Sequence, residues 1–332
     1  MTPSSEPVPM LALTTTALVD AALAPHASPA AAARAAESLA ELATHAVPDD
    51  VSAYAAYHEL LWELHERSEP RTYVTRRFLC QAAHAVEEAR ILAAHAGDPR
   101  FEVAELSTAA FRERILELHE RGSGMRHPLS IHLFEGTPAH RDVLVYLQHH
   151  WYRSRGFHRE LTELSLSLSL HDAQGIVANL DDELGGGRPG RSHPELLQRL
   201  LVHLGVPCDW GERPPWVEAL AYLDNRVRCA RSGEPAWGLA VLFSLEHGTP
   251  ATHGSILALL RRMGVPEPLC EFHQIHALGD AAHAEVILEL VLRRVVTPSA
   301  RRALLVSLHH HRTLGLCYFD RIWREIQQRQ AV

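Results

Sequence analysis

Apolar residues recur three and four positions apart along almost the whole chain, which is the spacing of one face of an α-helix. Clear examples are "VSAYAAYHELLWELHERS" at 51–68 and "SHPELLQRLLVHLG" at 192–205. One stretch alternates, "LSLSLSL" at 164–170, but it lies between helical patterns and is interpreted as the end of a helix. The pattern therefore predicts an all-α protein.

The same spacing predicts where the helices lie. Residues 1–30 are rich in Pro, Ser, Ala and Thr and are expected to be partly irregular. The glycine-rich "RGSGMRHP" at 121–128 predicts a division into an N-terminal helical extension (1–120) and a second domain (121–332). The predicted helices cover 31–47, 51–68, 72–97, 109–122, 140–168, 171–186, 192–205, 216–233, 235–248, 252–264, 269–296 and 299–328.

Composition narrows the possible functions. The chain has 332 residues, of which 46% are hydrophobic, so it can bury a large core. Its formal charge of −8 and the lack of a basic block argue against a nucleic-acid surface. All 32 basic residues are arginines, which excludes a lysine Schiff base and a phosphate-binding loop with its lysine.

The five cysteines are scattered and form no C-x-x-C pair, which is typical of reduced thiols in a cytoplasmic protein. The N-terminus does not resemble a signal peptide, and no apolar run suits a membrane span. The 24 histidines are unusually many, and many of them, such as "HHH" at 309–311, are expected to face solvent. We therefore expect a cytoplasmic protein without a membrane segment.

One apolar helix carries three ionisable residues on a single stripe. His276, Asp280 and His283 are four and three positions apart in "HALGDAAHAEV", and these steps return to the same face of a helix. Burying such groups without partners costs several kcal/mol. The three side chains therefore either face water together or share a partner.

Two other segments contain candidate partners. Glu246 closes the apolar run "PAWGLAVLFSLE", where a buried carboxylate needs a cation or a hydrogen-bond donor. Glu183 ends a helix after Asp181 and Asp182, although acids at a helix C-terminus oppose the helix dipole. Taken singly, the two aspartates would be solvated and Glu246 paired with an arginine.

A capping box fixes one more histidine. Ser192 and Glu195 have the S-x-x-E spacing that begins a helix, and this places His193 in its first turn. The preceding "GGGRPG" at 185–190 follows a helix rather than a strand, so it is interpreted as a helix end and loop, not a phosphate cradle. His253 and His273 lie near the candidates and are interpreted as bystanders or supporting residues.

The candidate residues share one chemistry. Three carboxylates and three imidazoles without a thiolate suit iron or manganese. The chain contains no E-x-x-H, so the ferritin type of di-iron centre is not supported. The combined set consists of Glu183, His193, Glu246, His276, Asp280 and His283.

With these motifs in order, the sequence resembles the heme-oxygenase-like diiron oxidases, relatives of the thiaminase-II and pyrroloquinoline-quinone-synthase proteins. The resemblance covers about residues 125–330 and rests on "NLDDELGGGRPGRSHPELLQRLL", Glu246 and the H-x3-D-x2-H spacing. It implies a bundle of about seven core helices, commonly dimeric. It also implies that the six residues bind two Fe²⁺ ions, with Glu183, Glu246 and Asp280 as catalytic carboxylates and Glu246 between the metals.

The resemblance further implies the reaction. Labile Fe²⁺ would use O2 to oxidise a small aliphatic amino acid or similar amine in natural-product biosynthesis, by C–H cleavage that leads to desaturation, cyclisation or C–C fragmentation. A manganese–iron centre and an external electron donor remain open. The alternatives are N-oxygenation of an amine or guanidine, fatty-acid decarboxylation, and a metal-free binding protein of the same superfamily.

Two further expectations concern the substrate. N-oxygenating relatives carry an extra carboxylate ligand, and family spacing places its position at Phe157, which is not an acid. Glu160 lies one turn further on. If Phe157 is the matching position, the missing carboxylate favours C–H oxidation over N-oxygenation. Candidate substrate-binding residues are Tyr152, Arg153, Arg155 and Arg312, although a solvated basic face would explain the first arginines equally well.

Overall fold

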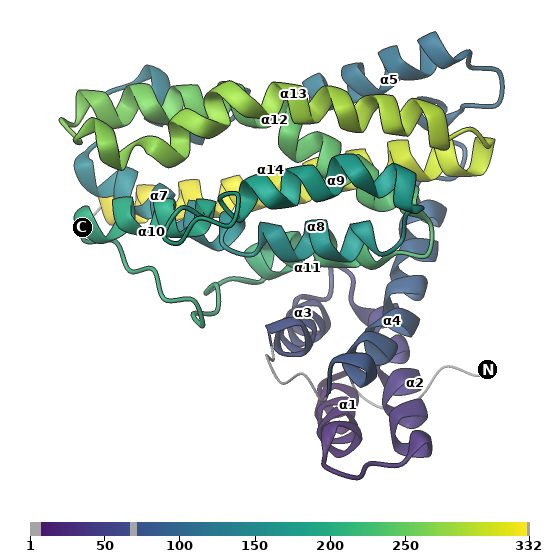
Figure 1. Cartoon of the computed structure of the whole chain (residues 1–332). Helices are drawn as coiled ribbons and strands as arrows, with labels where there is room; N and C mark the ends of the chain where they lie inside the picture. Colours follow the sequence, from purple (N-terminus) through teal and green to yellow (C-terminus); the bar gives the residue numbers. More distant parts are fainter. Residues whose placement is uncertain (1–7, 67–71, 331–332) are drawn as a thin grey trace. The chain divides into compact units, whose positions relative to one another are not determined.

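The computed structural model describes residues 8–66 and 72–330, and within these ranges it contains helices and no strand (Figure 1). This confirms the all-α prediction. The helices are α1 (Val8–Leu23), α2 (Pro29–His45), α3 (Val51–Glu66), α4 (Tyr73–Ala94), α5 (Thr108–Arg121), α6 (Pro128–Ser130), α7 (His140–Ser154), α8 (Phe157–Ser165), α9 (Leu170–Glu183), α10 (His193–His203), α11 (Val217–Arg231), α12 (Pro235–Arg262), α13 (Glu271–Arg294) and α14 (Pro298–Gln330).

The chain forms two compact units. The first comprises Met1–Asp98 together with Pro215–Arg228, so that it takes in most of α11. The second comprises Pro99–Pro214 and Cys229–Val332. The domain boundary predicted near residue 120 stays a prediction.

The first unit packs α2 between α1 and α4, with α3 against α1. Its core consists largely of small and aliphatic residues such as Ala35, Leu39 and Leu42, which allow close approach of the helices. Helix α1 occupies most of the segment that was expected to be partly irregular. Its threonines fit a helix because Thr15 donates to the Leu11 carbonyl 2.7 Å away and lies 2.8 Å from the Ser38 hydroxyl.

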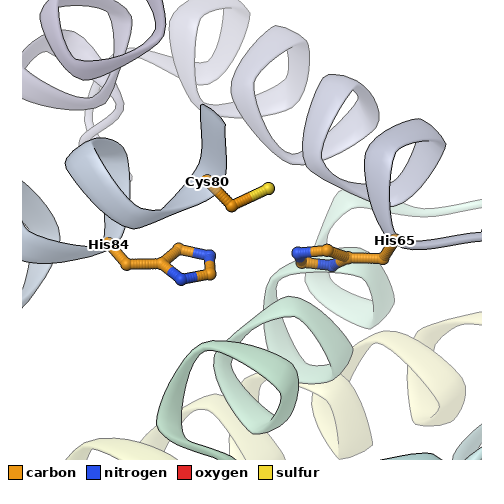
Figure 2. Close-up of side chains that lie close together, drawn as sticks. All are labelled: His65, Cys80 and His84. Carbon is orange, nitrogen blue, oxygen red and sulfur yellow. The ribbon is translucent and has the colours of Figure 1, made fainter. Parts of the chain in front are cut away.

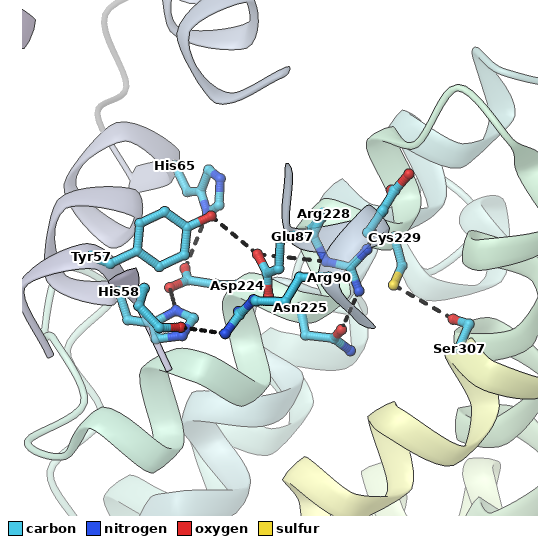
Figure 3. Close-up of polar contacts among 12 residues, drawn as sticks. Tyr57, His58, His65, Glu87, Arg90, Asp224, Asn225, Arg228, Cys229 and Ser307 are labelled. Carbon is cyan, nitrogen blue, oxygen red and sulfur yellow. Dashed lines mark hydrogen bonds and ion pairs between the residues drawn. The ribbon is translucent and has the colours of Figure 1, made fainter. Parts of the chain in front are cut away.

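A buried polar network joins α4 to α11 within the first unit (Figure 3). Arg228 is fully buried and donates to Glu88 at 3.3 Å and to Asn225 at 2.7 Å. Its Nε lies 3.8 Å from a carboxylate oxygen of Glu87, which also accepts the Tyr57 hydroxyl at 3.1 Å. Because a buried charge is tolerated only with partners, this network fixes α11 against α4.

The second unit is organised around two long helices. Helices α12 and α13 follow each other through a short connection and run side by side along most of their length (Figure 1). Helix α14 also packs on α12, whereas α9 and α10 both contact α13. Helices α9, α10 and α12 thus bring residues from separate parts of the sequence against α13.

Two helix boundaries differ from the sequence prediction. The single helix expected over 140–168 is two, α7 and α8, separated at Arg155 and Gly156. The two helices expected over 235–248 and 252–264 are one, because α12 continues through Pro250.

One of the three histidines expected in solvent at 309–311, His311, is buried. The stretch at 164–170 does end a helix, because α8 stops at Ser165.

Candidate metal centre

The stripe predicted on the H-x3-D-x2-H helix lies on α13 and faces the interior of the second unit. His276 and Asp280 are buried, and His283 is half-buried. Each of the three has a carboxylate or imidazole neighbour from another helix. The stripe therefore shares partners and does not simply face water.

The first group of donors joins three helices. Glu183 lies at the end of α9, His193 at the start of α10 and His276 on α13, and all three are buried. One oxygen of Glu183 is 2.9 Å from Nδ1 of His193 and 3.4 Å from Nε2 of His276. One donor atom of each residue lies within 4.8 Å of the others, which suits a shared cation. We call these residues the first triad.

Local sequence explains how Glu183 and His193 are held. The loop between them turns sharply because Gly185 has a φ of +74°, and a side chain at this position would collide with the backbone of Arg191. Helix α10 then begins with the predicted capping box, in which Ser192 donates its hydroxyl to Glu195 at 2.5 Å and its backbone N–H at 3.2 Å. His193 follows directly and is fixed in direction. The helix-end interpretation of "GGGRPG" is thereby confirmed.

The second group of donors consists of Glu246 from α12 with Asp280 and His283 from α13, and we call it the second triad. Their donor atoms also lie within 4.8 Å of one another. Nδ1 of His283 is 3.7 Å from Glu246, and its Nε2 is 3.1 Å from the exposed Asp182. Asn179 donates to the other oxygen of Glu246 at 2.7 Å.

Sequence reasoning missed Asn179 and treated Asp182 as solvated. The signal for Asn179 was its position four residues before Glu183, which puts both side chains on one stripe of α9. In α12, Pro250 has no N–H to offer the Glu246 carbonyl four residues earlier. The helix is therefore weakened at the turn that carries a candidate ligand.

The first triad behaves as an ion pair. Burial would raise the pKa of Glu183, but the contacts with His193 and His276 lower it to about 2. Burial would likewise lower the pKa of His276, yet Glu183 and the charge of Asp280 raise it to about 9. A cation that binds here displaces a proton from His276, so metal binding and protonation compete.

The second triad has two carboxylates and one imidazole, whereas the first has one carboxylate and two imidazoles. Burial is the largest influence on the pKa of Asp280 and raises it. The charge of His276 lowers this pKa, whereas the charges of Glu246 and Glu183 raise it further. The contact with Glu246 raises the pKa of His283 to about 9 although the ring is partly buried. Asp280 thus interacts electrostatically with both triads, and the triads adjoin along α13.

The donor chemistry of the two triads fits iron. Carboxylate oxygens and imidazole nitrogens are the ligands of non-heme iron and manganese sites, and no thiolate belongs to either triad. Around them, His276 Nδ1 donates to the Phe272 carbonyl at 2.7 Å, an outer contact that orients a metal-binding imidazole. The six residues that the sequence singled out are thus brought together, and their role as ligands stays a prediction.

A third group lies beside the first triad and was not foreseen as a unit. His150, His253 and His273 are buried with ring nitrogens within 4.8 Å of one another, and we call them the three-histidine group. His253 packs against His276 with ring centroids 4.6 Å apart. Arg153 donates to Nδ1 of His150 at 3.1 Å, which leaves the ring proton on Nε2 rather than a free lone pair.

The four candidate substrate residues are engaged with the protein. Arg155 donates to the Asp209 carbonyl at 2.5 Å and to the Glu212 carbonyl, and Arg312 donates to the Gly122 carbonyl at 2.5 Å. Tyr152 is buried, and its hydroxyl accepts from Gln148 at 3.3 Å. Arg153 and Arg155 are therefore not a solvated basic face, and a role in substrate binding stays a prediction for all four.

The extra carboxylate ligand expected of N-oxygenating relatives would be the seventh ligand of the site. Phe157 begins α8, and none of the metal-compatible groups found among the described residues includes Glu160.

No helix among the described residues is both long enough and apolar enough to cross a membrane.

Comparison with known families agrees with this geometry. A family model described as an iron-containing redox enzyme matches residues 144–314, slightly more than half of the chain. A second model, haem-oxygenase-associated N-terminal helices, matches residues 2–90. No functionally curated protein matches the chain.

Solved structures give the fold. A domain of unknown function with a heme oxygenase-like fold from Shewanella denitrificans OS217 aligns with a TM-score of 0.54 at 14% identity, over 68% of this chain and 96% of the other. A CADD-like protein of unknown function from Nostoc punctiforme PCC 73102 aligns with a TM-score of 0.56 at 15% identity, over 68% and 98%. The fold is heme-oxygenase-like, as the sequence resemblance implied.

Proposed function

Because the chain belongs to the family of iron-containing redox enzymes, we propose that it is a non-heme diiron oxidase that uses O2. The observation that carries this proposal is the gathering of three carboxylates and three imidazoles into two adjoining triads on four helices. One iron would be held by Glu183, His193 and His276, and the other by Glu246, Asp280 and His283. Two ferrous ions held in this way supply the electrons that activate O2.

The protein's own contribution is to hold these ligands in place and away from water. Asn179 fixes one oxygen of Glu246, which leaves the other oxygen directed toward His283. Asp182 accepts from Nε2 of His283 and so directs its Nδ1 inward. Such outer contacts set ligand orientation and metal affinity. Glu246 would lie between the two metals, as the resemblance implies, with one oxygen held by Asn179 and the other directed toward His283.

We propose a small aliphatic amino acid or similar amine as the substrate, oxidised by C–H cleavage to a desaturated, cyclised or fragmented product. Phe157, at the position where family spacing places the extra carboxylate of N-oxygenating relatives, supports C–H over N–O chemistry. Arg153, held next to the three-histidine group, is the candidate for the substrate carboxylate. A homodimer, a cytoplasmic location and a role in natural-product biosynthesis belong to the same proposal.

The test is anaerobic titration with Fe²⁺, followed by rapid mixing with O2 in the presence of amino acids, amines, guanidines and fatty acids. We expect about two irons per chain and O2 consumption that one substrate class accelerates. Asp280→Ala and His283→Ala should lose iron while keeping their helical circular dichroism, and His310→Ala should bind iron normally. A protein that takes up no iron and consumes no O2 would be a metal-free binding protein, and a hydroxylamine or nitroso product would establish N-oxygenation.

A further inference from the structure

The first unit contains a cluster of soft and nitrogen donors that shares no residue with the two triads. His65 lies in the last turn of α3, and Cys80 and His84 lie on α4. One donor atom of each lies within 4.8 Å of the other two. In Figure 2 the sulfur of Cys80 and the rings of His65 and His84 point toward one another. Cys80 and His84 are four residues apart, so one stripe of α4 presents both.

A carboxylate orients one of the two histidines. Nδ1 of His65 lies 3.2 Å from Oδ1 of Asp224, a residue of α11 that belongs to the same unit (Figure 3). Because a carboxylate accepts, Nδ1 carries the proton and the lone pair lies on Nε2. A carboxylate behind the ring in this way is typical of metal-binding histidines. The other oxygen of Asp224 is held by His58 at 2.9 Å, so the carboxylate is itself fixed.

The cluster is shielded from bulk solvent. Cys80 is fully buried, His84 is 5% exposed, and Asp224 is 2% exposed. The side chain of His65 is 5% exposed. A thiol this deeply buried is not accessible as a surface nucleophile. Its use as a metal ligand is compatible with burial, since a bound cation stabilises the thiolate.

The donor set selects the metal. One thiolate and two imidazoles suit Zn²⁺, which takes Cys sulfur at about 2.3 Å and His nitrogen at about 2.0–2.1 Å in tetrahedral sites. Donor atoms of such a site lie about 3.4–3.7 Å apart, so small rotations of the side chains would close a group that already lies within 4.8 Å. The all-oxygen-and-nitrogen triads of the second unit offer no sulfur, so the two regions differ in the metals they prefer.

We propose that His65, Cys80 and His84 form a Zn²⁺ site with Asp224 as the positioning residue behind His65. A water molecule would occupy the fourth coordination position of the zinc. Bound zinc ties the end of α3 to α4 and, through Asp224, to α11, and therefore stabilises the first unit. This gives the N-terminal helices a chemistry that is independent of the proposed iron site.

The test uses the full chain, stripped of metal, kept reduced and titrated with Co²⁺. Only a site with a cysteine ligand gives a thiolate-to-cobalt charge-transfer absorption, so the two triads are silent in this band. We expect the band to saturate as cobalt is added and Zn²⁺ to abolish it. Zn²⁺ should also raise the melting temperature of the wild-type chain.

The variants assign the band. Cys80→Ser should abolish it, along with the zinc-dependent rise in melting temperature, and Cys229→Ser, a buried cysteine of the second unit, should retain both. Asp224→Asn should weaken zinc binding about 10–100-fold. If Cys80→Ser fails to fold, His84→Gln keeps the thiol and should weaken cobalt binding to the same or a greater extent than Asp224→Asn. The proposal is overturned if the wild-type chain gives no band, if the band survives in the folded Cys80→Ser chain, or if the His84→Gln chain binds cobalt as tightly as the wild type.

Discussion

His273 and His276 are both buried and lie three residues apart on α13, yet their environments shift their pKa values in opposite directions. Burial and the charge of His276 lower the pKa of His273 to about 3, so this ring is neutral. The pKa of His276 is about 9 despite equal burial, because Glu183 outweighs the loss of solvent. His273 belongs to the three-histidine group, whereas His276 belongs to the first triad.

The difference between the two groups is a carboxylate. Burial, followed by the charges of neighbours such as Arg153 and His276, also lowers the pKa values of His150 and His253 well below the usual range for histidine. Neutral imidazoles can pack in a core as polar rings, whereas an imidazole beside a carboxylate becomes half of an ion pair that a cation can replace. A cluster of histidines is therefore weak support for iron, and the acid beside it is the informative residue.

Glu183→Gln should give the largest effect, because it removes the acid that distinguishes the first triad. The change leaves His276 buried beside a neutral amide and takes away an anionic ligand. We expect iron content to fall from about two per chain to one or fewer, measured by elemental analysis after anaerobic loading. Glu195→Gln changes an acid of the neighbouring capping box and should keep its iron; equal iron in wild-type and Glu183→Gln chains would show that the carboxylate is not a ligand.

Asn179→Ala should have an intermediate effect, because Asn179 orients a carboxylate without belonging to either triad. Loss of its 2.7 Å hydrogen bond frees Glu246 to rotate. Removing an outer contact of this kind typically weakens metal binding about 10–100-fold. Anaerobic Fe²⁺ titration should show one weakened and one unchanged iron. Val177→Ala, at an exposed position of the same helix, is the matched control, and identical titrations for both variants would contradict the role of Asn179.

Much of the site could be predicted from sequence because its determinants are local. The spacing of His276, Asp280 and His283 places them on one helical face whatever the helix packs against. The capping box similarly fixes His193 at a helix start. Both features depend only on residues close together in the sequence. Three separate segments with such features follow one another in the same order as in a known family.

The remaining features depend on contacts between distant segments. The break at Gly156 accompanies Arg155, which donates to the carbonyls of Asp209 and Glu212, more than fifty residues away. Conversely, α12 continues through Pro250 because it packs along α13. A proline inside an isolated helix would cost about 3 kcal/mol. Tertiary packing overrode local preference in both cases, and no pattern within one segment could reveal it.

His253→Ala should leave iron uptake unchanged, because the three-histidine group lacks the acid that the triads contain. The truncated ring opens a cavity beside His276, so we expect unfolding in urea to require about 2 kcal/mol less free energy. Iron content and urea unfolding of the metal-free chain would both be measured. Loss of iron in this variant would mean that the three-histidine group, and not the carboxylate, defines the metal centre.

His119 extends the comparison to a buried imidazole that belongs to neither triad, and its replacement should have the smallest effect. Burial, followed by the charges of Arg312 and His247, lowers the pKa of His119 from 6.5 to about 3. Between these values the unfolded chain binds a proton that the folded chain excludes, so the stability of the fold decreases as pH falls through this window. His119→Gln abolishes this difference and should flatten the dependence by at most about 1.4 kcal/mol per pH unit. Urea unfolding at pH 7 and pH 5 would measure it, with His171→Gln, a change at an exposed ring, as the control. If the His119→Gln chain loses as much stability between these pH values as the wild type, burial does not keep His119 neutral, and the contrast with His276 would need another cause.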